Sequence, residues 1–174
     1  EAVHLFEEGE NMRRLDESML EFGMPMGPLR LLDEVGLDVS DHVSQDLSER
    51  LAHFPFPSPI LATLALNGQV GRKSGKGFYL HGAKDHTPNP FAQRLRRTIA
   101  PRRTNADLAN CMTLVMVNEA ARVLEEGVVN NPKDIDFGMM LGTGWAPFRG
   151  GPLRFADHEG IAPIVIKLKK LYHE

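Results

Sequence analysis

The residues best suited to chemistry form a glycine-rich basic segment at positions 71–77, which reads Gly-Arg-Lys-Ser-Gly-Lys-Gly. Glycine amides and a lysine at such a turn can bind phosphate. A nucleotide P-loop, however, needs a glycine five residues before its Gly-Lys pair and Ser or Thr after it, whereas Val70 and Gly77 stand there. The spacing therefore favours a structural turn. Arg72, Lys73 and Lys76 stay candidates for contact with an anionic ligand or a neighbouring domain.

Other reactive side chains form no recognisable site. The arginine cluster at 94–103 lacks interleaved aromatic residues and is typical of a solvated linker rather than a nucleic-acid surface. The seven histidines are scattered without the helical spacing of metal ligands, so we expect each at the surface. No nucleophile, base and orienting residue come together, and no Gly-x-Gly-x-x-Gly follows a strand. The sequence alone predicts no catalytic, cofactor-binding or metal site.

Composition excludes several classes of protein. The 174 residues are 42% hydrophobic and 25% charged, as in an ordinary globular chain. A net charge of −3 gives no general attraction to nucleic acid, and no apolar run is long enough to span a membrane. Cys111 is the only cysteine, which fits a reducing compartment. We therefore expect a cytoplasmic protein, or one of the mitochondrial matrix if the source is eukaryotic.

The chain contains an internal repeat. Residues 1–9 (EAVHLFEEG) return as residues 119–127 (EAARVLEEG), and Gly-Pro-Leu-Arg at 27–30 returns at 151–154. The spacing increases from 118 to 124 residues between these blocks, so six residues are inserted in the second copy, as expected for surface loops. A fixed repeat predicts two copies of one structural unit. We place the first domain at residues 1–100, with a truncated start, and the second, shorter one at 101–174.

The periodicity predicts helices throughout. The clearest spans about 105–126, with an apolar stripe that includes Val115 and Leu124, and Gly127 is placed to end it. Further amphipathic segments cover 11–22, 40–52, 58–66 and 161–172, and another begins at Pro132. Gly27 is expected to adopt positive φ before a helix opened by Pro28. No segment alternates strongly enough for a sheet, so we predict an all-α fold.

These residues resemble the C-terminal domain of 3-hydroxyacyl-CoA dehydrogenases. The strings at 22–38 (FGMPMGPLRLLDEVGLD) and 71–79 (GRKSGKGFY) look like that family's signatures. The strings at 118–127 (NEAARVLEEG) and 147–154 (PFRGGPLR) look like the second copy of its larger members. A chain with two copies is similar to the multifunctional type, the α-subunit of the fatty-acid β-oxidation complex. The resemblance implies two tandem helical domains, of the type also seen at the C-terminus of 6-phosphogluconate dehydrogenase, packed together as a pseudo-dimer.

The resemblance also implies a function. The family oxidises L-3-hydroxyacyl-CoA to 3-ketoacyl-CoA with NAD, and its catalytic residues and NAD site lie in an N-terminal Rossmann domain that nothing here matches. This chain would form one wall of the acyl-CoA cleft and would be inactive alone. Its partners would be acyl-CoA, the Rossmann domain and a thiolase subunit. The alternative is a non-enzymatic helical interaction module, which a start codon at this point of the parent gene would favour.

Overall fold

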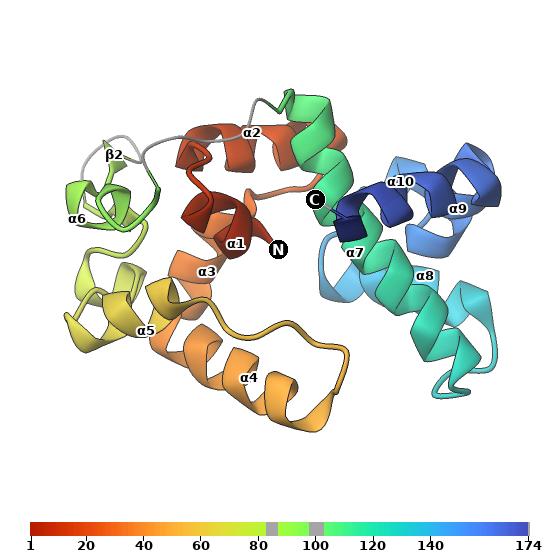
Figure 1. The fold of residues 1–174 in the computed structure, drawn as a ribbon, viewed down its shortest axis with the longest axis horizontal. Coiled ribbons are helices and arrows are strands. Elements are labelled where there is room, and N and C mark those ends of the chain that lie inside the picture. The colour runs from red at the N-terminus through yellow and green to blue at the C-terminus, as the bar shows by residue number, and fades with distance from the viewer. Residues whose placement is uncertain (83–86, 98–102, 174) are drawn as a thin grey trace. The chain divides into compact units, whose positions relative to one another are not determined.

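The computed structural model describes residues 1–82, 87–97 and 103–173. The described residues are mainly helical (Figure 1), which confirms the predicted fold class, although one short hairpin is added. In chain order the elements are α1 Ala2–Glu7, α2 Met12–Phe22, α3 Pro28–Val35, α4 Leu37–Arg50, α5 Pro59–Leu66, η1 Arg72–Ser74, β1 Tyr79–Leu80, β2 Thr87–Pro88, α6 Pro90–Gln93, α7 Asn105–Glu125, α8 Pro132–Gly142, η2 Pro147–Arg149, α9 Pro152–Glu159 and α10 Ile161–His173.

The chain divides into two compact units. Unit 1 comprises residue 1, residues 18–25 and residues 103–174, and unit 2 comprises residues 2–17 and 26–102. Helix α2 therefore contributes its first half to unit 2 and its second half to unit 1. The boundary that the sequence suggests near residue 100 lies outside the described residues, together with Arg102 of the arginine cluster and His86. The division into domains 1–100 and 101–174 stays a prediction.

Unit 2 is built around large apolar side chains from its helices and from the segment after η1. Leu15, Leu29 and Leu64 are fully buried. Phe6 and Phe78 meet edge to face, with ring centroids 5.5 Å apart. Helices α4 and α5 pack on each other, in the orange and yellow part of Figure 1. Strands β1 and β2 form an antiparallel pair.

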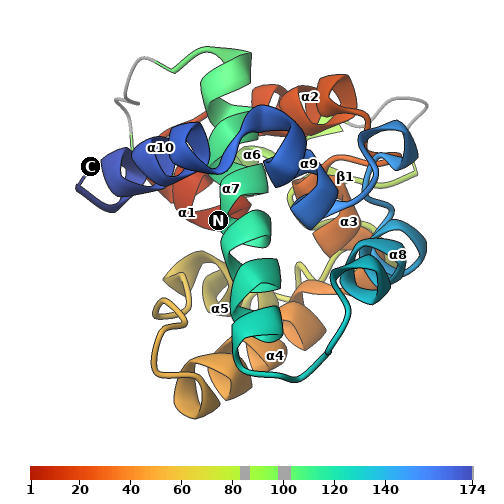
Figure 2. The same ribbon diagram turned by 90° about the vertical axis from the view of Figure 1, so that its right-hand side faces the viewer.

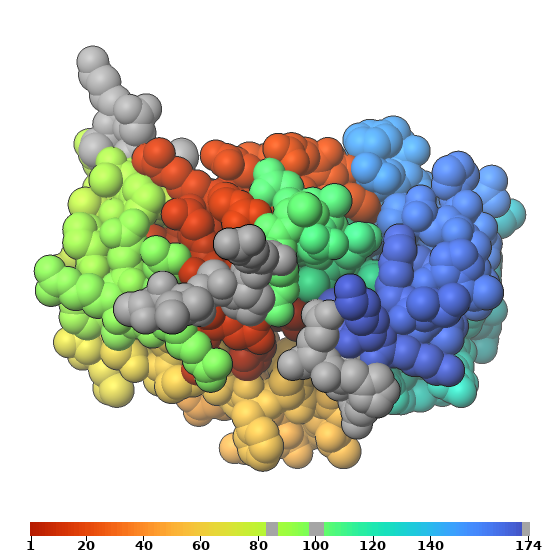
Figure 3. All heavy atoms as spheres, turned by 45° about the horizontal axis from the view of Figure 1, so that its top comes forward, coloured from red at the N-terminus to blue at the C-terminus, as the bar shows by residue number. Residues whose placement is uncertain are grey.

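Unit 1 is organised on the long helix α7. Thr104 begins this helix with a capping box, in which its side chain and that of Asp107 exchange hydrogen bonds with each other's backbone N–H. Helices α8, α9 and α10 pack on α7 or on each other (Figure 2), and α10 lies at the surface shown in blue in Figure 3. Trp145, which is fully buried, contacts Phe22 and Phe155 edge to face at 5.3 and 5.9 Å.

The structure shows the repeat element by element. Helices α2, α3 and α4 of the first copy correspond to α8, α9 and α10 of the second. Helices α2 and α8 each have 11 residues, and α3 and α9 each have 8. Gly36 and Gly160 end α3 and α9 with nearly the same backbone, φ 107° and 88°. Four of the six extra residues lie between α8 and Gly151 and two lie before α8, so the inserted length is outside the matched helices.

Two sequence expectations about the helices and their turns are wrong. Gly27 has φ −70°, an ordinary extended value, and the turn needs glycine for another reason: a Cβ there would collide with the side chain of Asp16. Val115 was placed in the buried stripe of the long helix but is 44% exposed. Leu114 and Val117 are buried instead, while Leu108, Met112 and Ala120 on the same helix are also buried. Gly127 does end α7 with φ 69°, as expected.

Candidate functional site

The glycine-rich segment 71–77 folds as a tight turn packed on helix α3. η1 covers Arg72–Ser74, and the Gly71 N–H donates to the Lys76 carbonyl oxygen at 2.9 Å. A Cβ on Gly71 would collide with the backbone of Asp33, and one on Gly77 would collide with the Asp33 side chain. The glycines are therefore required by close approach to α3, which agrees with the structural interpretation of this segment.

Asp33 is the centre of this contact. Its Oδ1 accepts from the Phe78 N–H at 2.8 Å, and its Oδ2 accepts from the Tyr79 N–H at 2.9 Å. The same Oδ2 lies 2.8 Å from Nε2 of His81. The Asp33 side chain is fully enclosed and that of His81 is only 7% exposed. One carboxylate thus satisfies three nitrogen groups of the segment that follows the glycine-rich turn.

A second buried carboxylate, Asp16 on α2, continues this arrangement. Its Oδ1 accepts from the Leu29 N–H at 2.8 Å, which caps the start of α3. Its Oδ2 accepts from the Tyr79 hydroxyl at 2.7 Å. Tyr79 therefore bonds Asp33 through its backbone and Asp16 through its side chain. We call Asp16, Asp33, Tyr79 and His81 the carboxylate network.

Burial dominates the electrostatics of this network. It raises the pKa of Asp16 from 3.8 to about 6, although the hydrogen bonds from Tyr79 and Leu29 oppose the shift. Burial also raises the pKa of Asp33, against hydrogen bonds from the backbone of Tyr79 and Phe78. The pKa of the Tyr79 hydroxyl is raised by burial and by the Asp16 carboxylate beside it. The oxygens of both carboxylates already accept hydrogen bonds from the chain's own donors. The network is therefore suited to stabilising the fold rather than to acting on a substrate.

The three basic side chains named as ligand candidates do not gather on one site. Arg72 donates to both oxygens of Glu34 at 2.7 and 3.0 Å. Lys73 bonds Asp38 at 2.7 Å. Hydrogen bonds from Arg72 and Arg30 lower the pKa of Glu34 against the cost of desolvation, and the hydrogen bond from Lys73 lowers the pKa of Asp38. Lys76 is exposed. Two of the three positive charges are therefore paired with acids of α3 and α4, and their role toward an anionic ligand stays a prediction.

The second copy has a counterpart of Asp16. Asp136 is the fifth residue of α8, as Asp16 is of α2. It accepts from the N–H groups of Leu153 and Arg154 at 2.8 and 3.1 Å. A Cβ on Gly151 would collide with Asp136, just as one on Gly27 would collide with Asp16. Burial raises the pKa of Asp136, and the two backbone hydrogen bonds oppose the shift. The same capping device thus begins α3 and α9.

Sequence reasoning missed these acids and misplaced one histidine. Aspartate at the fifth position of both matched helices was a readable signal once the repeat was aligned. His81 was expected at the surface, and that is wrong because Asp33 binds it inside unit 2. Within residues 1–82, 87–97 and 103–173, no three His, Cys, Asp or Glu side chains group as metal ligands, and no helix is both long and apolar enough to cross a bilayer.

Comparison with known proteins finds a family model that matches the first part of the chain. Residues 1–81 match the family model described as 3-hydroxyacyl-CoA dehydrogenase, C-terminal domain. The chain is 38% identical over 172 residues to a fatty acid oxidation complex subunit alpha of Vibrio parahaemolyticus, and 39% identical over 176 residues to one of Shewanella loihica. These matches cover 98% of this chain but only 24% of each relative. The chain thus spans about a quarter of the curated relatives' length.

Two solved structures share the fold. A 3-hydroxybutyryl-CoA dehydrogenase of Escherichia coli K12 aligns with TM-score 0.78 at 19% identity, over 99% of this chain and 53% of that one. The dehydrogenase part of a multifunctional enzyme of C. elegans aligns with TM-score 0.61 at 28% identity, over 83% of this chain and 36% of that one. At its low identity the first match shows the fold alone. The resemblance predicted from the sequence motifs is confirmed.

Proposed function

We propose that this chain is the helical C-terminal part of an NAD-dependent L-3-hydroxyacyl-CoA dehydrogenase of fatty-acid β-oxidation, because residues 1–81 match the family model of the 3-hydroxyacyl-CoA dehydrogenase C-terminal domain. The observation that carries the proposal is the match over 98% of the chain to subunits alpha of fatty acid oxidation complexes. In this proposal the chain forms a wall of the acyl-CoA cleft, and a preceding Rossmann domain supplies catalysis. The parent protein belongs to the cytoplasm or the mitochondrial matrix and joins a thiolase subunit.

The residues of this chain do not fit NAD. A dinucleotide site needs a strand, a Gly-x-Gly-x-x-Gly turn and a helix whose N-terminus receives the pyrophosphate. The sequence contains no such glycine pattern, and the described strands are two residues long and antiparallel. Hydride transfer therefore belongs to the preceding domain, and this chain contributes shape and contacts rather than redox groups.

Helices α3 and α4 carry a face that suits contact with that domain. Leu31, Val35, Val39 and Val43 recur every four residues across the two helices, and each is about half exposed. At the positions of Val35 and Val43 the second copy has Glu159 and Lys167, whose side chains pair at 3.7 Å. Helix α10 exposes other apolar residues (Ile161, Val165 and Ile166). Exposed apolar side chains of this kind are typical of an interaction surface, and we assign this face to contact with the Rossmann domain.

Reconstitution tests the function. The 174-residue chain alone should not reduce NAD with 3-hydroxybutyryl-CoA, because it lacks the base and the cofactor site. Adding the domain encoded upstream in the parent gene should restore NADH production, followed by absorbance. Turnover by the pure chain, or an upstream domain that is fully active without it, would overturn the proposal and favour the interaction module.

The apolar face has its own test. Replacing Val35 with Glu and Val43 with Lys gives the first copy the ion pair of the second. We expect the double variant to keep its fold and to bind the upstream domain at least about tenfold more weakly. Leu66→Glu is a control, because Leu66 is 87% exposed at the end of α5 and outside this face. Equal weakening by both variants would show that the face is not the contact.

A further inference from the structure

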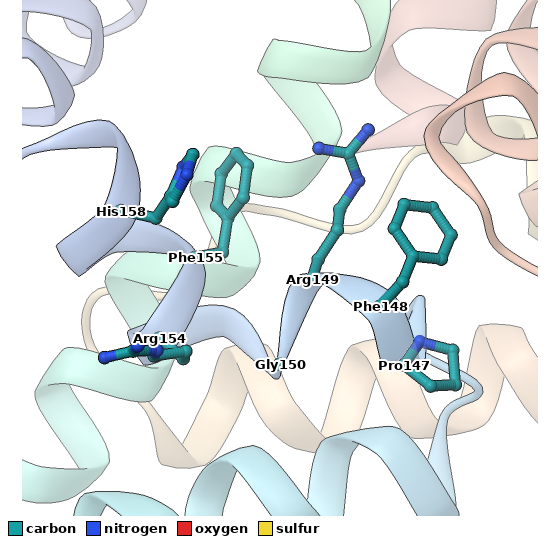
Figure 4. A pocket seen from close by; sticks show the side chains of 7 residues that line it. All are labelled: Pro147, Phe148, Arg149, Gly150, Arg154, Phe155 and His158. Atoms are coloured by element: carbon teal, nitrogen blue, oxygen red, sulfur yellow. The ribbon is translucent and has the colours of Figure 1, made fainter.

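An open cavity of about 370 Å³ lies in unit 1, where η2 and the glycine that ends it meet α9 (Figure 4). Its volume falls within the range of small-molecule sites. Phe148 and Phe155 contribute phenyl rings to the lining, and Arg149 contributes a guanidinium group. Figure 4 shows the Arg149 side chain standing between those of Phe155 and Phe148. This part of the cavity therefore has a cation with an aromatic ring on each side.

The Arg149 guanidinium is held in one orientation by unit 1 itself. Its Nε donates to the Phe22 carbonyl oxygen at 2.8 Å, at the C-terminal end of α2, where a positive charge is favourable. The guanidinium carbon lies 4.1 Å from the centroid of the Phe22 ring and 5.3 and 5.7 Å from those of Phe148 and Phe155. Cations are attracted to ring faces at such distances. The group is thus positioned without a ligand.

The two terminal nitrogens of Arg149 are available to a ligand. Among the described residues only the Nε of this side chain has a hydrogen-bond partner, and no carboxylate forms an ion pair with it. Neither terminal nitrogen is enclosed without a partner, so both can be reached from solvent. A guanidinium fixed through Nε presents Nη1 and Nη2 as a fork that matches the two oxygens of a carboxylate.

The other basic residues of the lining do not add to this cation. Figure 4 shows the Arg154 side chain pointing away from the Arg149 guanidinium, and its charge acts on Asp136. His158 is 86% exposed, with Glu159 at 4.0 Å. One guanidinium balances one negative charge, whereas a phosphate dianion would keep an uncompensated charge beside the phenyl rings. The cavity therefore suits a monoanion.

We propose that this cavity binds an aromatic monocarboxylate. The carboxylate accepts hydrogen bonds from Nη1 and Nη2 of Arg149, and the ligand's ring packs beside that of Phe148, which is 76% exposed. The Phe148 ring lies so close to α2's end that a Cβ on Gly23 would collide with it. The binding of such an acid is independent of the proposed function, which does not use this cavity.

NMR titration of the 174-residue chain with benzoate tests the site. We expect the amide signals of Phe148, Arg149 and Gly150 to shift, with a dissociation constant on the order of 1 mM. Benzamide has the same shape without the charge, and acetate lacks the ring. Each should bind at least about tenfold more weakly than benzoate. No shift at about 20 mM benzoate, or equal binding of benzamide, would overturn the proposal.

Two variants identify the cation that binds the acid. Arg149→Lys keeps the charge but loses the fork, so we expect benzoate to bind at least about tenfold more weakly. Arg154→Gln is the matched control, because it removes a positive charge from the same lining, and it should leave the affinity within about twofold. Equal losses in both variants would show a general attraction of anions and would overturn the proposal.

A third variant keeps the proposal testable if Arg149→Lys does not fold. Phe148→Ala changes an exposed ring and should weaken benzoate about fivefold while leaving the weak binding of acetate unchanged. Equal effects on the two acids would contradict the packing of the ligand's ring on Phe148.

A further titration distinguishes two sources of the carboxylate. Tighter binding of N-acetylphenylalanine than of benzoate would assign the site to the C-terminal end of a peptide chain, and the reverse would assign it to a free small acid. Either result supports a carboxylate at Arg149. None of these measurements depends on dehydrogenase activity, so the cavity can fail while the proposed function stands.

Discussion

The two copies share one way of starting a helix, but they differ in the segment that packs over that helix. In both, an aspartate at the fifth position of one helix caps the Gly-Pro-Leu start of the next. In the first copy the chain then returns over α3 with Phe78, Tyr79 and His81, and Asp33 is buried beneath them. In the second copy the matching Asp157 is exposed. The sequence has no second example of the 71–79 string.

This difference teaches that a repeated residue need not keep its role. An aspartate on an exposed helix end costs little, whereas a buried one must be matched by donors. Asp33 has such donors because the glycines at 71 and 77 let the backbone approach it. Asp157 has no covering segment, and it is an ordinary surface acid. The following variants test this contrast in order of expected effect.

The largest effect is expected from Asp33→Ala. This change leaves the N–H groups of Phe78 and Tyr79 and the ring of His81 without their buried partner. We expect the free energy of unfolding to fall by about 3–5 kcal/mol, measured by urea denaturation. The matched control is Asp157→Ala in the second copy, which should change it by less than about 0.5 kcal/mol. Similar losses in both variants would show that the two aspartates are equivalent, and the contrast would be wrong.

The next effect depends on pH and comes from Asp16. A carboxyl whose pKa rises from 3.8 to about 6 on folding keeps its proton in the folded chain after the unfolded chain has lost it. The stability of the native protein therefore falls as the pH rises from about 4 to about 6, by up to about 3 kcal/mol. Asp16→Asn removes this titration, and its unfolding midpoint should change less over the same range.

Tyr79→Phe is a second test of the pH dependence of stability that Asp16 causes. The Tyr79 hydroxyl donates to Asp16 and lowers its pKa, so removing it raises that pKa further. The pH range over which stability falls should then extend upward, and the variant should lose about 1 kcal/mol at neutral pH. An unchanged pH profile in both variants would mean that Asp16 is not the group that titrates.

Two glycine-to-alanine substitutions are expected to change the free energy of unfolding in opposite directions. Gly27→Ala places a Cβ against Asp16, so we expect a loss of about 1–3 kcal/mol in the free energy of unfolding. Gly138, inside α8, has open space where its Cβ would be. Gly138→Ala should therefore stabilise by about 0.5–1 kcal/mol, because alanine favours a helix interior. If both variants lost stability alike, the close approach at Gly27 would not be the cause.

Much of the fold could be read from the sequence, and the reasons are local. Helix periods, the Pro-opened turns and the glycine at 127 are decided by residues near each other in the chain. The network of Asp16, Asp33 and Tyr79 joins residues up to 63 positions apart, and no pattern in one sequence fixes such pairs. Gly27 and His81 were misjudged for the same reason, since each is constrained by a distant aspartate.

The smallest effect is expected from the basic side chains of the glycine-rich turn. Arg72 and Glu34 form an ion pair in which Arg72 is 63% exposed, and exposed pairs contribute little because water screens them. Arg72→Gln should lower the free energy of unfolding by less than about 1 kcal/mol, far below the loss in Asp33→Ala on the same helix contact. Lys76→Gln serves as its control in the same urea series. A loss in Arg72→Gln comparable to that of Asp33→Ala would show that surface charge, rather than the buried carboxylate, holds the covering segment on α3.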